Sequence, residues 1–259
     1  MIGQATLADA GRRRVLGAAG GVSALVAMPA LGLAAEHSLT LQPFALDYSG
    51  YLVSGMGSTP LASARLTAAS EGGRFSVELV VESFLADLTY RSRGIIDQHG
   101  LKPLQYQERR KVAFRSAREK TVMYVHTDDS KIQNTQVGDQ LFVPTGAQDR
   151  LSLILQVIWM SRRQPQLLSN DAEFGMPFAR VSRVSESRWR VRGPEPLVRQ
   201  EDEGPSRGSR VSGYRITRVA DQRDTVDVAF WLSADQKLQP LVLQFAEKGR
   251  RLRFVHDSV

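Results

Sequence analysis

The side chains best suited to catalysis or metal binding are few in this sequence and lie far apart. The chain has no cysteine and four histidines, which are His37, His99, His126 and His256. None of these histidines has a second histidine or a carboxylate at ligand spacing on the same expected element. Because a closed zinc site needs four nitrogen or sulfur ligands, the sequence predicts no metal site and no cofactor.

Two positions have side chains that could transfer protons. His126 precedes Asp128 and Asp129 and could act as a base oriented by an acid, but a strand that ends in an acidic turn explains the same residues. Asp149 is either a buried acid at the mouth of a cavity or a charge that suits the dipole at a helix start. We favour the structural explanation at both positions. The sequence also lacks a Gly-x-Ser-x-Gly elbow, a phosphate-binding glycine loop and a nicotinamide fingerprint, and it predicts no enzyme.

One apolar helix is expected near residues 147–163. Thr145 and Gln148 have the spacing of a capping box, and Arg162 and Arg163 suit the far end. Apolar residues cover most of its circumference, namely Leu151, Leu153, Ile154, Leu155, Val157, Ile158, Trp159 and Met160. A helix of this kind must be surrounded by protein, so we expect it to fill the concave face of a sheet.

Most of the chain after residue 36 alternates between apolar and polar residues, which is typical of strands with one buried face. Such segments are 48–53, 64–68, 75–82, 88–96, 105–114, 121–126, 189–191, 214–219, 226–232, 241–245 and 252–255. About ten or eleven short strands joined by tight turns predict a mainly β fold. We expect a large curved antiparallel sheet, or half-barrel, wrapped around the helix.

A proline-containing and acidic segment near residues 194–212 interrupts the strand pattern and predicts an exposed loop. No internal repeat or second domain boundary is evident in the sequence. Residues 36–259 are therefore expected to form a single β-rich domain.

The first 35 residues have the pattern of a signal peptide. Residues 12–14 are arginines, and the uncharged stretch 17–33 is rich in Ala, Gly, Leu and Val. These are the basic and apolar regions of an export signal. Because small residues end the stretch, we place cleavage after Ala34 or Ala35 and expect a periplasmic mature protein.

The arginines at 12–14, followed by Val15 and Leu16, resemble a twin-arginine export signal. General secretion, which also accepts arginines here, stays open as the alternative route. An uncleaved anchor is a third possibility, although an apolar run of about 17 residues is at the short end for a spanning helix. No other segment is long and apolar enough to span a bilayer, so the mature protein is not expected to cross one.

Residues 170–178 contain the other candidate binding segment. Phe174, Met176 and Phe178 surround a glycine and a proline. Apolar residues of this kind either fold onto the core or cover an opening as a lid. With Trp159 and Met160 of the helix they are the candidate ligand-binding residues, and core packing is the alternative for all five.

Short motifs in three parts of the chain carry a family pattern. They are Gly94 to Pro103 with the following Glu-Arg-Arg, residues 148–152 at the helix start, and residues 231–241. Together they resemble exported bacterial proteins catalogued as domain of unknown function 3108. The resemblance covers nearly the whole mature chain and departs at residues 201–208. It assigns no activity, and it implies a curved sheet like those of envelope carriers that hold acyl chains against a helix.

Two classes of function remain. The first is a non-enzymatic binding module for a lipid, an acyl chain, a lipoprotein or another apolar ligand of the envelope. The second is a structural or assembly protein of the envelope, with a solid core and no cavity. The chain has 34 basic and 27 acidic residues, but no basic stripe with interleaved aromatics, so nucleic acid is not an expected partner.

Overall fold

The computed structural model describes residues 41–54, 57–197, 211–219, 228–235, 237–247 and 250–259. They belong to one compact unit, Ser38–Val259, which contains two hydrophobic clusters. The expected signal peptide, its twin-arginine motif and its cleavage site lie outside the described residues.

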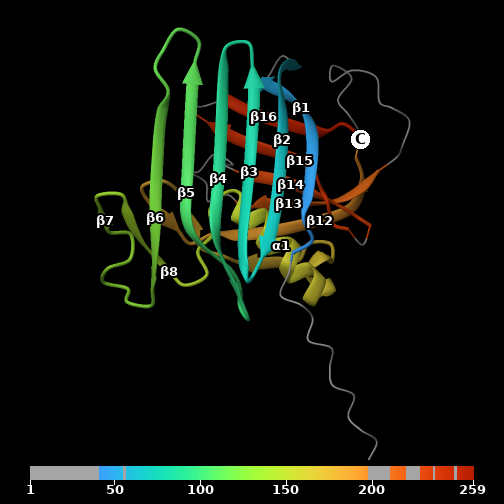
Figure 1. The fold of residues 1–259 in the computed structure, drawn as a ribbon. Helices are drawn as coiled ribbons and strands as arrows, with labels where there is room; N and C mark the ends of the chain where they lie inside the picture. The colour runs from blue at the N-terminus through green and yellow to red at the C-terminus, as the bar shows by residue number, and fades with distance from the viewer. Residues whose placement is uncertain (1–40, 55–56, 198–210, 220–227, 236, 248–249) are drawn as a thin grey trace, which may run out of the picture. The chain divides into compact units, whose positions relative to one another are not determined.

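Fourteen strands of the described chain form one large sheet, and two short strands, β10 and β11, form a separate pair. The order in the large sheet is β7-β8-β6-β5-β4-β3-β2-β1-β16-β15-β14-β13-β12-β9. The sheet is therefore not closed, and its edges are β7, which is labelled in Figure 1, and β9. The strands are β1 Phe44–Ser54, β2 Gly57–Glu71, β3 Arg74–Ser83, β4 Ala86–Asp97, β5 Gly100–Val112, β6 Arg118–Thr127, β7 Gln136–Val137, β8 Gln140–Pro144, β9 Glu173–Gly175, β10 Phe178–Ala179, β11 Val184–Ser185, β12 Arg188–Pro196, β13 Ser212–Arg218, β14 Val228–Ser233, β15 Pro240–Glu247 and β16 Arg250–His256.

The alternation seen in the sequence places one side of each long strand in the core. In β3 the four buried side chains are Phe75, Val77, Leu79 and Val81. In β14 every residue is buried, because alternate side chains belong to two different clusters. Phe230 joins the large cluster inside the sheet, whereas Trp231 joins a smaller one on the opposite face.

Irregular register bends the sheet at several points. The pairing of β1 with β2 shifts between Gly50 and Tyr51, and that of β4 with β5 shifts between Arg93 and Gly94. Bulges of this kind increase local twist and bend a strand. A Cβ at Gly94 would lie 2.1 Å from the carbonyl oxygen of Lys102, so the bend in β4 requires glycine.

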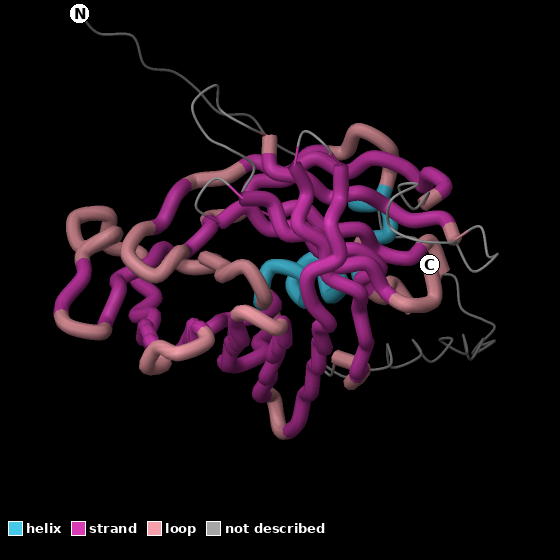
Figure 2. The backbone as a smooth tube through the Cα atoms, turned by 90° about the horizontal axis from the view of Figure 1, so that it is seen from above, coloured by secondary structure: helices cyan, strands magenta, loops and turns pink. Residues whose placement is uncertain are grey.

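The helix α1, Ser152–Arg163, has strands on several sides (Figure 2) and continues through a short 3-10 helix, η1, Pro165–Leu168. Its first seven residues and Ser161 are buried. The prediction of a mainly β half-barrel wrapped around one apolar helix is therefore confirmed.

Three details of that prediction are corrected. The described chain has sixteen strands, because five short ones, β7 to β11, were not expected; β7, β9, β10 and β11 contain only two or three residues and β8 contains five. The sheet is not wholly antiparallel, since β6 and β8 run parallel. Both ends of the loop expected near residues 194–212 belong to paired strands, β12 and β13, and residues 198–210 lie outside the described chain.

The predicted capping box at the helix start is wrong. The hydroxyl of Thr145 donates to Asp128, and the side-chain amide of Gln148 donates to the carbonyl oxygen of Leu101. Instead, Oδ1 of Asp149 accepts the backbone N–H groups of Leu151 and Ser152 at 2.9 Å. The hydroxyl oxygen of Ser152 accepts the N–H of Asp149 in return. This is the reciprocal pattern of a capping box, displaced along the chain by four residues.

Candidate ligand-binding cavity

The inner face of the long strands encloses a cavity of about 540 Å³ at the end of the sheet away from α1. It is lined by residues of β1, β2, β3, β4, β5 and β16 and of the turn between β3 and β4. Most of the lining is apolar and includes Leu52, Val81, Leu88, Val112, Leu252 and Phe254. A volume of this size is within the range of small-molecule sites, about 300–1,000 Å³.

Small residues leave the space open. Gly50, Ala62 and Ala86 line the cavity without bulky side chains. At Gly50 a Cβ would lie 3.0 Å from the ring of Phe254 and 3.1 Å from the carbonyl oxygen of Ala62. A larger residue there would push the Phe254 ring out of place, so this glycine sets one wall of the cavity.

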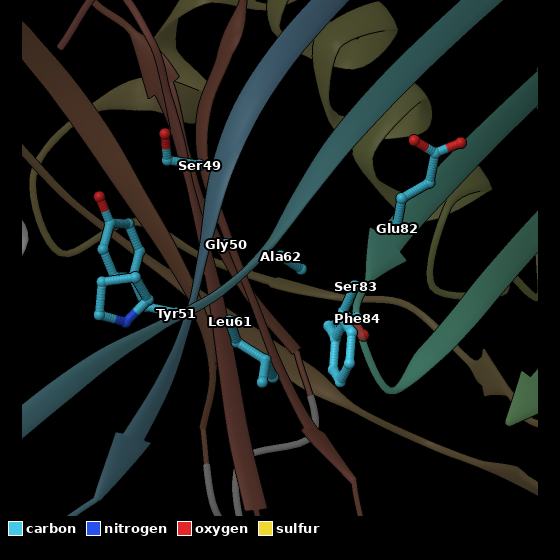
Figure 3. Close-up of a pocket in the computed structure, with 9 residues that line it drawn as sticks. Ser49, Gly50, Tyr51, Leu61, Ala62, Glu82, Ser83 and Phe84 are labelled. Atoms are coloured by element: carbon cyan, nitrogen blue, oxygen red, sulfur yellow. The ribbon is translucent and has the colours of Figure 1, made fainter. Parts of the chain in front are cut away.

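A second hollow of about 540 Å³ shares part of this wall and is more open to solvent. Figure 3 shows Leu61 and the ring of Phe84 near each other, with Ser49 and Glu82 pointing the opposite way. Its lining combines the carboxylate of Glu82 and serine hydroxyls with apolar groups, so it is more polar than that of the first cavity. The more enclosed and more apolar cavity is therefore the better candidate for ligand binding.

Two arginines mark the mouth of the cavity. Arg110 on β5 lines it, and Arg118 on β6 lies directly opposite Arg110 in the strand register. Directly opposed residues point to the same face of a sheet, and like charges in such a pair are destabilising. Both side chains are exposed, and guanidinium groups are suited to donate hydrogen bonds to an anionic group.

A polar cluster lies between the cavity and α1. The next inward pair beyond Leu88 and Arg110 is Tyr90 and Glu108. The guanidinium of Arg150 lies 3.9 Å from the Glu108 carboxylate and 5.0 Å from the centre of the Tyr90 ring. These residues do not line the cavity, and they form a charged cluster next to it on the inner face of the sheet.

Asp149 is the buried acid of this cluster. Its Oδ2 accepts a hydrogen bond of 2.6 Å from the hydroxyl of Ser92. Burial raises the pKa of Asp149 above its ordinary value of 3.8, and the hydrogen bonds from Ser92, Ser152 and Leu151 oppose that shift. Each interpretation of Asp149 from the sequence therefore holds in part, since the carboxyl group is buried and also accepts hydrogen bonds at the start of the helix. It does not line the cavity.

The five residues proposed from the sequence as ligand contacts lie elsewhere in the fold. Met176 and Phe178 are buried in the main cluster, while Trp159, Met160 and Phe174 are partly buried against it. The Phe178 ring packs edge-on against Trp189 at a centroid distance of 5.8 Å. None of the five lines either hollow, and their role in ligand binding stays a prediction.

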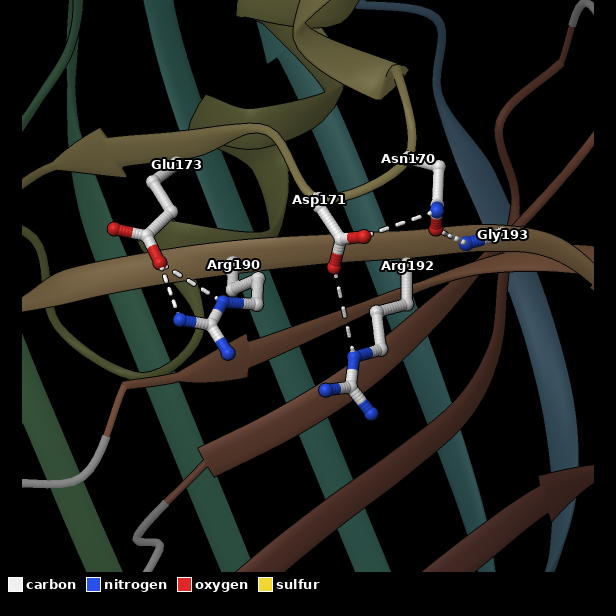
Figure 4. Close-up of polar contacts among 6 residues, drawn as sticks. All are labelled: Asn170, Asp171, Glu173, Arg190, Arg192 and Gly193. Atoms are coloured by element: carbon white, nitrogen blue, oxygen red, sulfur yellow. Dashed lines mark hydrogen bonds and ion pairs between the residues drawn. The ribbon is translucent and has the colours of Figure 1, made fainter.

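Polar contacts fix the segment before Phe178 to the edge of the sheet (Figure 4). The carboxylate of Glu173 accepts two hydrogen bonds from Arg190, at 2.6 and 2.8 Å. Asp171 lies 3.9 Å from Arg192, and the side-chain oxygen of Asn170 accepts a backbone N–H of β12. Within the segment expected to be either a lid or a core anchor, residues 173–175 thus form the edge strand β9, and Phe178 begins β10.

His126, the histidine considered as a base, contacts the backbone and not the neighbouring acids. A ring nitrogen of His126 lies 2.6 Å from the carbonyl oxygen of Pro103, whereas Asp128 is bonded to Thr145. Within the described part of the chain, no group of three or more His, Asp or Glu side chains is placed to hold a metal ion. Among the helices that the structure describes, none has the length and apolar character needed to cross a membrane.

Sequence reasoning missed the cavity because its lining residues occupy ordinary alternating strand positions. Leu88 and Leu252 have the same pattern as side chains that fill a solid core. One usable signal was Arg110, which interrupts the apolar face of β5. A second was the pair Phe84 and Leu85, which places two large apolar residues in a tight turn.

These features define a mainly β protein with an open sheet around one helix and an apolar cavity between its strands. The family model described as "Protein of unknown function (DUF3108)" matches residues 51–249, and the chain belongs to this family, as its motifs predicted. A search of curated proteins finds no match. Among solved structures the chain is similar to a beta-barrel-like protein of domain of unknown function DUF1849 from Brucella abortus. The sequence identity is 9%, the TM-score is 0.48, and the match covers 84% of this chain and 96% of the other.

Proposed function

We propose that this protein is a non-enzymatic binding module that holds the acyl chain of an anionic amphiphile. The observation that supports it best is the apolar cavity of about 540 Å³ between the long strands. Apolar pockets with a few convergent polar groups are the usual sites of small-molecule binding. The chain of the ligand would contact Leu88, Leu252 and Phe254.

The arginines at the mouth support an anionic head group. Arg110 and Arg118 are directly opposed on the inner face of β5 and β6. A carboxylate or phosphate accepts paired N–H bonds from guanidinium groups. An amphiphile could therefore place its tail among the apolar residues and its head between the two arginines.

The test is binding of dansyl-labelled undecanoic acid to the purified compact unit, Ser38–Val259. We expect wild-type affinity in the micromolar range, about −8 kcal/mol. Leu88→Trp fills the cavity and should weaken binding about tenfold or more, equivalent to about 1.4 kcal/mol. Thr89→Trp is the matched control because adjacent strand residues face opposite sides, and it should bind like the wild type.

Displacement of the probe by unlabelled ligands distinguishes the contribution of the ligand's tail to binding from that of its head group. Palmitate should displace the probe better than hexadecanol, and Arg110→Gln with Arg118→Gln should remove that difference. If the wild type does not bind, or if Leu88→Trp and Thr89→Trp bind equally, the cavity is not the site.

We also propose that the protein acts outside the cytoplasm, as residues 1–35 indicate. A fusion of residues 1–40 to a reporter that is active only after export in the folded state should report export. Arg12→Lys with Arg13→Lys should abolish the signal if the twin-arginine route is used. Unchanged export of the double variant would favour general secretion.

A further inference from the structure

Large apolar side chains project from two turns at one end of the sheet. Among the described residues, the most exposed of this kind are Phe114 and Phe84, with exposed fractions of 107% and 96%. Leu85, beside Phe84, is exposed to 60%. Exposed apolar residues that gather at one place, unlike scattered ones, mark interaction sites.

The two turns lie against each other. Phe84 and Leu85 connect β3 to β4, and residues 113–117 connect β5 to β6, at the same end of the sheet (Figure 1). The backbone N–H of Ala113 donates to the carbonyl oxygen of Leu85 at 3.0 Å. The hydroxyl of Ser83 bonds the N–H and the carbonyl oxygen of Ala86 across the first turn. The apolar side chains are thus held on a firm backbone.

The backbone at Phe114 is unusual for an aromatic residue. Its φ angle is +62°, in the left-handed region that glycine and asparagine adopt most readily. Turn formation alone would favour one of those residues. The chain instead carries a fully exposed phenyl ring at this position, which indicates that the ring takes part in an interaction.

Basic residues flank the turn that carries Phe114, while two exposed carboxylates, Glu82 and Asp87, flank the turn that carries Phe84 and Leu85. Between residues 108 and 120 the chain has two acidic side chains, Glu108 and Glu119, and six basic ones. All six are exposed, and they are Arg109, Arg110, Lys111, Arg115, Arg118 and Lys120. Aromatic and leucine side chains flanked by Lys and Arg suit the interface of an anionic bilayer.

We propose that this end of the sheet docks onto an anionic lipid bilayer. The side chains of Phe84, Leu85 and Phe114 enter the boundary between head groups and acyl chains, and the basic residues contact the head groups. Two narrow turns offer little surface compared with the roughly 800 Å² per partner of a typical protein interface. Insertion into lipid, by contrast, needs only the projecting side chains.

The cavity opens at the same end, since Leu85 and Val112 line it. Docking would bring its mouth to the lipid surface. The docking proposal does not depend on the cavity being occupied, and the two proposals can fail separately because vesicle binding and probe binding are measured on different variants.

The test is cosedimentation of the compact unit, Ser38–Val259, with vesicles of phosphatidylglycerol and phosphatidylcholine in equal parts. The wild type should bind, and binding should fall as salt is raised because exposed charges are screened. The double variant Phe84→Ser, Phe114→Asn should lose about tenfold or more in partitioning, because apolar contact with the lipid is removed. Asn tolerates the left-handed backbone, and thermal unfolding should show that the fold is kept.

Val137→Ser is the matched control, because Val137 on β7 is also 60% exposed and lies away from the two turns. It should bind vesicles like the wild type. Equal binding by the double variant, equal binding to vesicles of pure phosphatidylcholine, or no binding by the wild type would each overturn the proposal. A further outcome is that the wild type self-associates without binding vesicles and the double variant does not self-associate. That result would assign Phe84, Leu85 and Phe114 to a protein interface instead.

Discussion

The buried hydrogen bond between Ser92 and Asp149 gives a sharp test of how the helix is held. Ser92→Ala removes a 2.6 Å bond to a fully buried carboxyl group. A hydrogen bond to a charged group contributes roughly 1.5–3 kcal/mol, and one between neutral groups roughly 0.5–1.5 kcal/mol. We therefore expect the free energy of unfolding to fall by about 2 kcal/mol when Asp149 is ionised. In a domain of this size that lowers Tm by roughly 4–8 °C.

The loss should depend on pH. Because burial raises the pKa of Asp149 above 3.8 in the folded state, the folded protein keeps this proton to higher pH than the unfolded chain. The contribution of this group to stability therefore falls as pH rises through the window above 3.8. Without the hydrogen bond from the Ser92 hydroxyl, the pKa of Asp149 rises further. As pH rises through that window, the free energy of unfolding of the variant should therefore fall more steeply than that of the wild type.

The assay is urea unfolding of both proteins at several values between pH 4 and pH 8. Ser161→Ala is the matched control, since Ser161 is buried and no described residue hydrogen-bonds its hydroxyl. It should change stability by less than about 0.5 kcal/mol. Equal losses for the two serine variants, or a Ser92→Ala loss that is the same at both ends of the range, would refute the reasoning.

Three further predictions concern packing and pH. Ile158→Asp places an unpaired charge in the core and should prevent folding, as judged by circular dichroism, whereas exposed Gln164→Asp should be tolerated. Phe178→Ser, which removes a buried ring, should cost about 3–5 kcal/mol in urea unfolding, while Phe174→Ser should cost clearly less because Phe174 is only partly buried. Burial lowers the pKa of His126 below 6.5. Its contribution to stability is therefore lost as pH falls below 6.5, and His126→Gln should flatten the fall in Tm over that range.

The sequence predicted the parts of this fold that depend on local periodicity. Alternation located β3 and other long strands, and the apolar segment located α1 to within a few residues at its start. Both patterns reflect which face of an element is buried, and that information is local. The half-barrel then followed because an apolar helix and an open sheet must cover each other.

Other features depend on contacts between distant residues and were not predictable in this way. Thr145 and Gln148 match a capping box by spacing, but they bond Asp128 and Leu101 instead. Asp149 combines a helix-start role with a bond to Ser92, 57 positions earlier in the chain. The cavity joins β1 to β16, the two ends of the described chain. Alternation specifies that Leu252 points inward, but not whether another side chain meets it there.

The open sheet also bears on how this protein behaves at high concentration. A sheet that does not close leaves two rows of backbone N–H and C=O groups that could pair with another molecule and seed aggregation. Here the two edge strands are among the shortest in the described chain, with two residues in β7 and three in β9. The β9 edge also carries the ion pair between Glu173 and Arg190. The long strands thereby lie in the interior of the sheet. The short edge strands protect the sheet from polymerisation, as closure into a barrel would otherwise do.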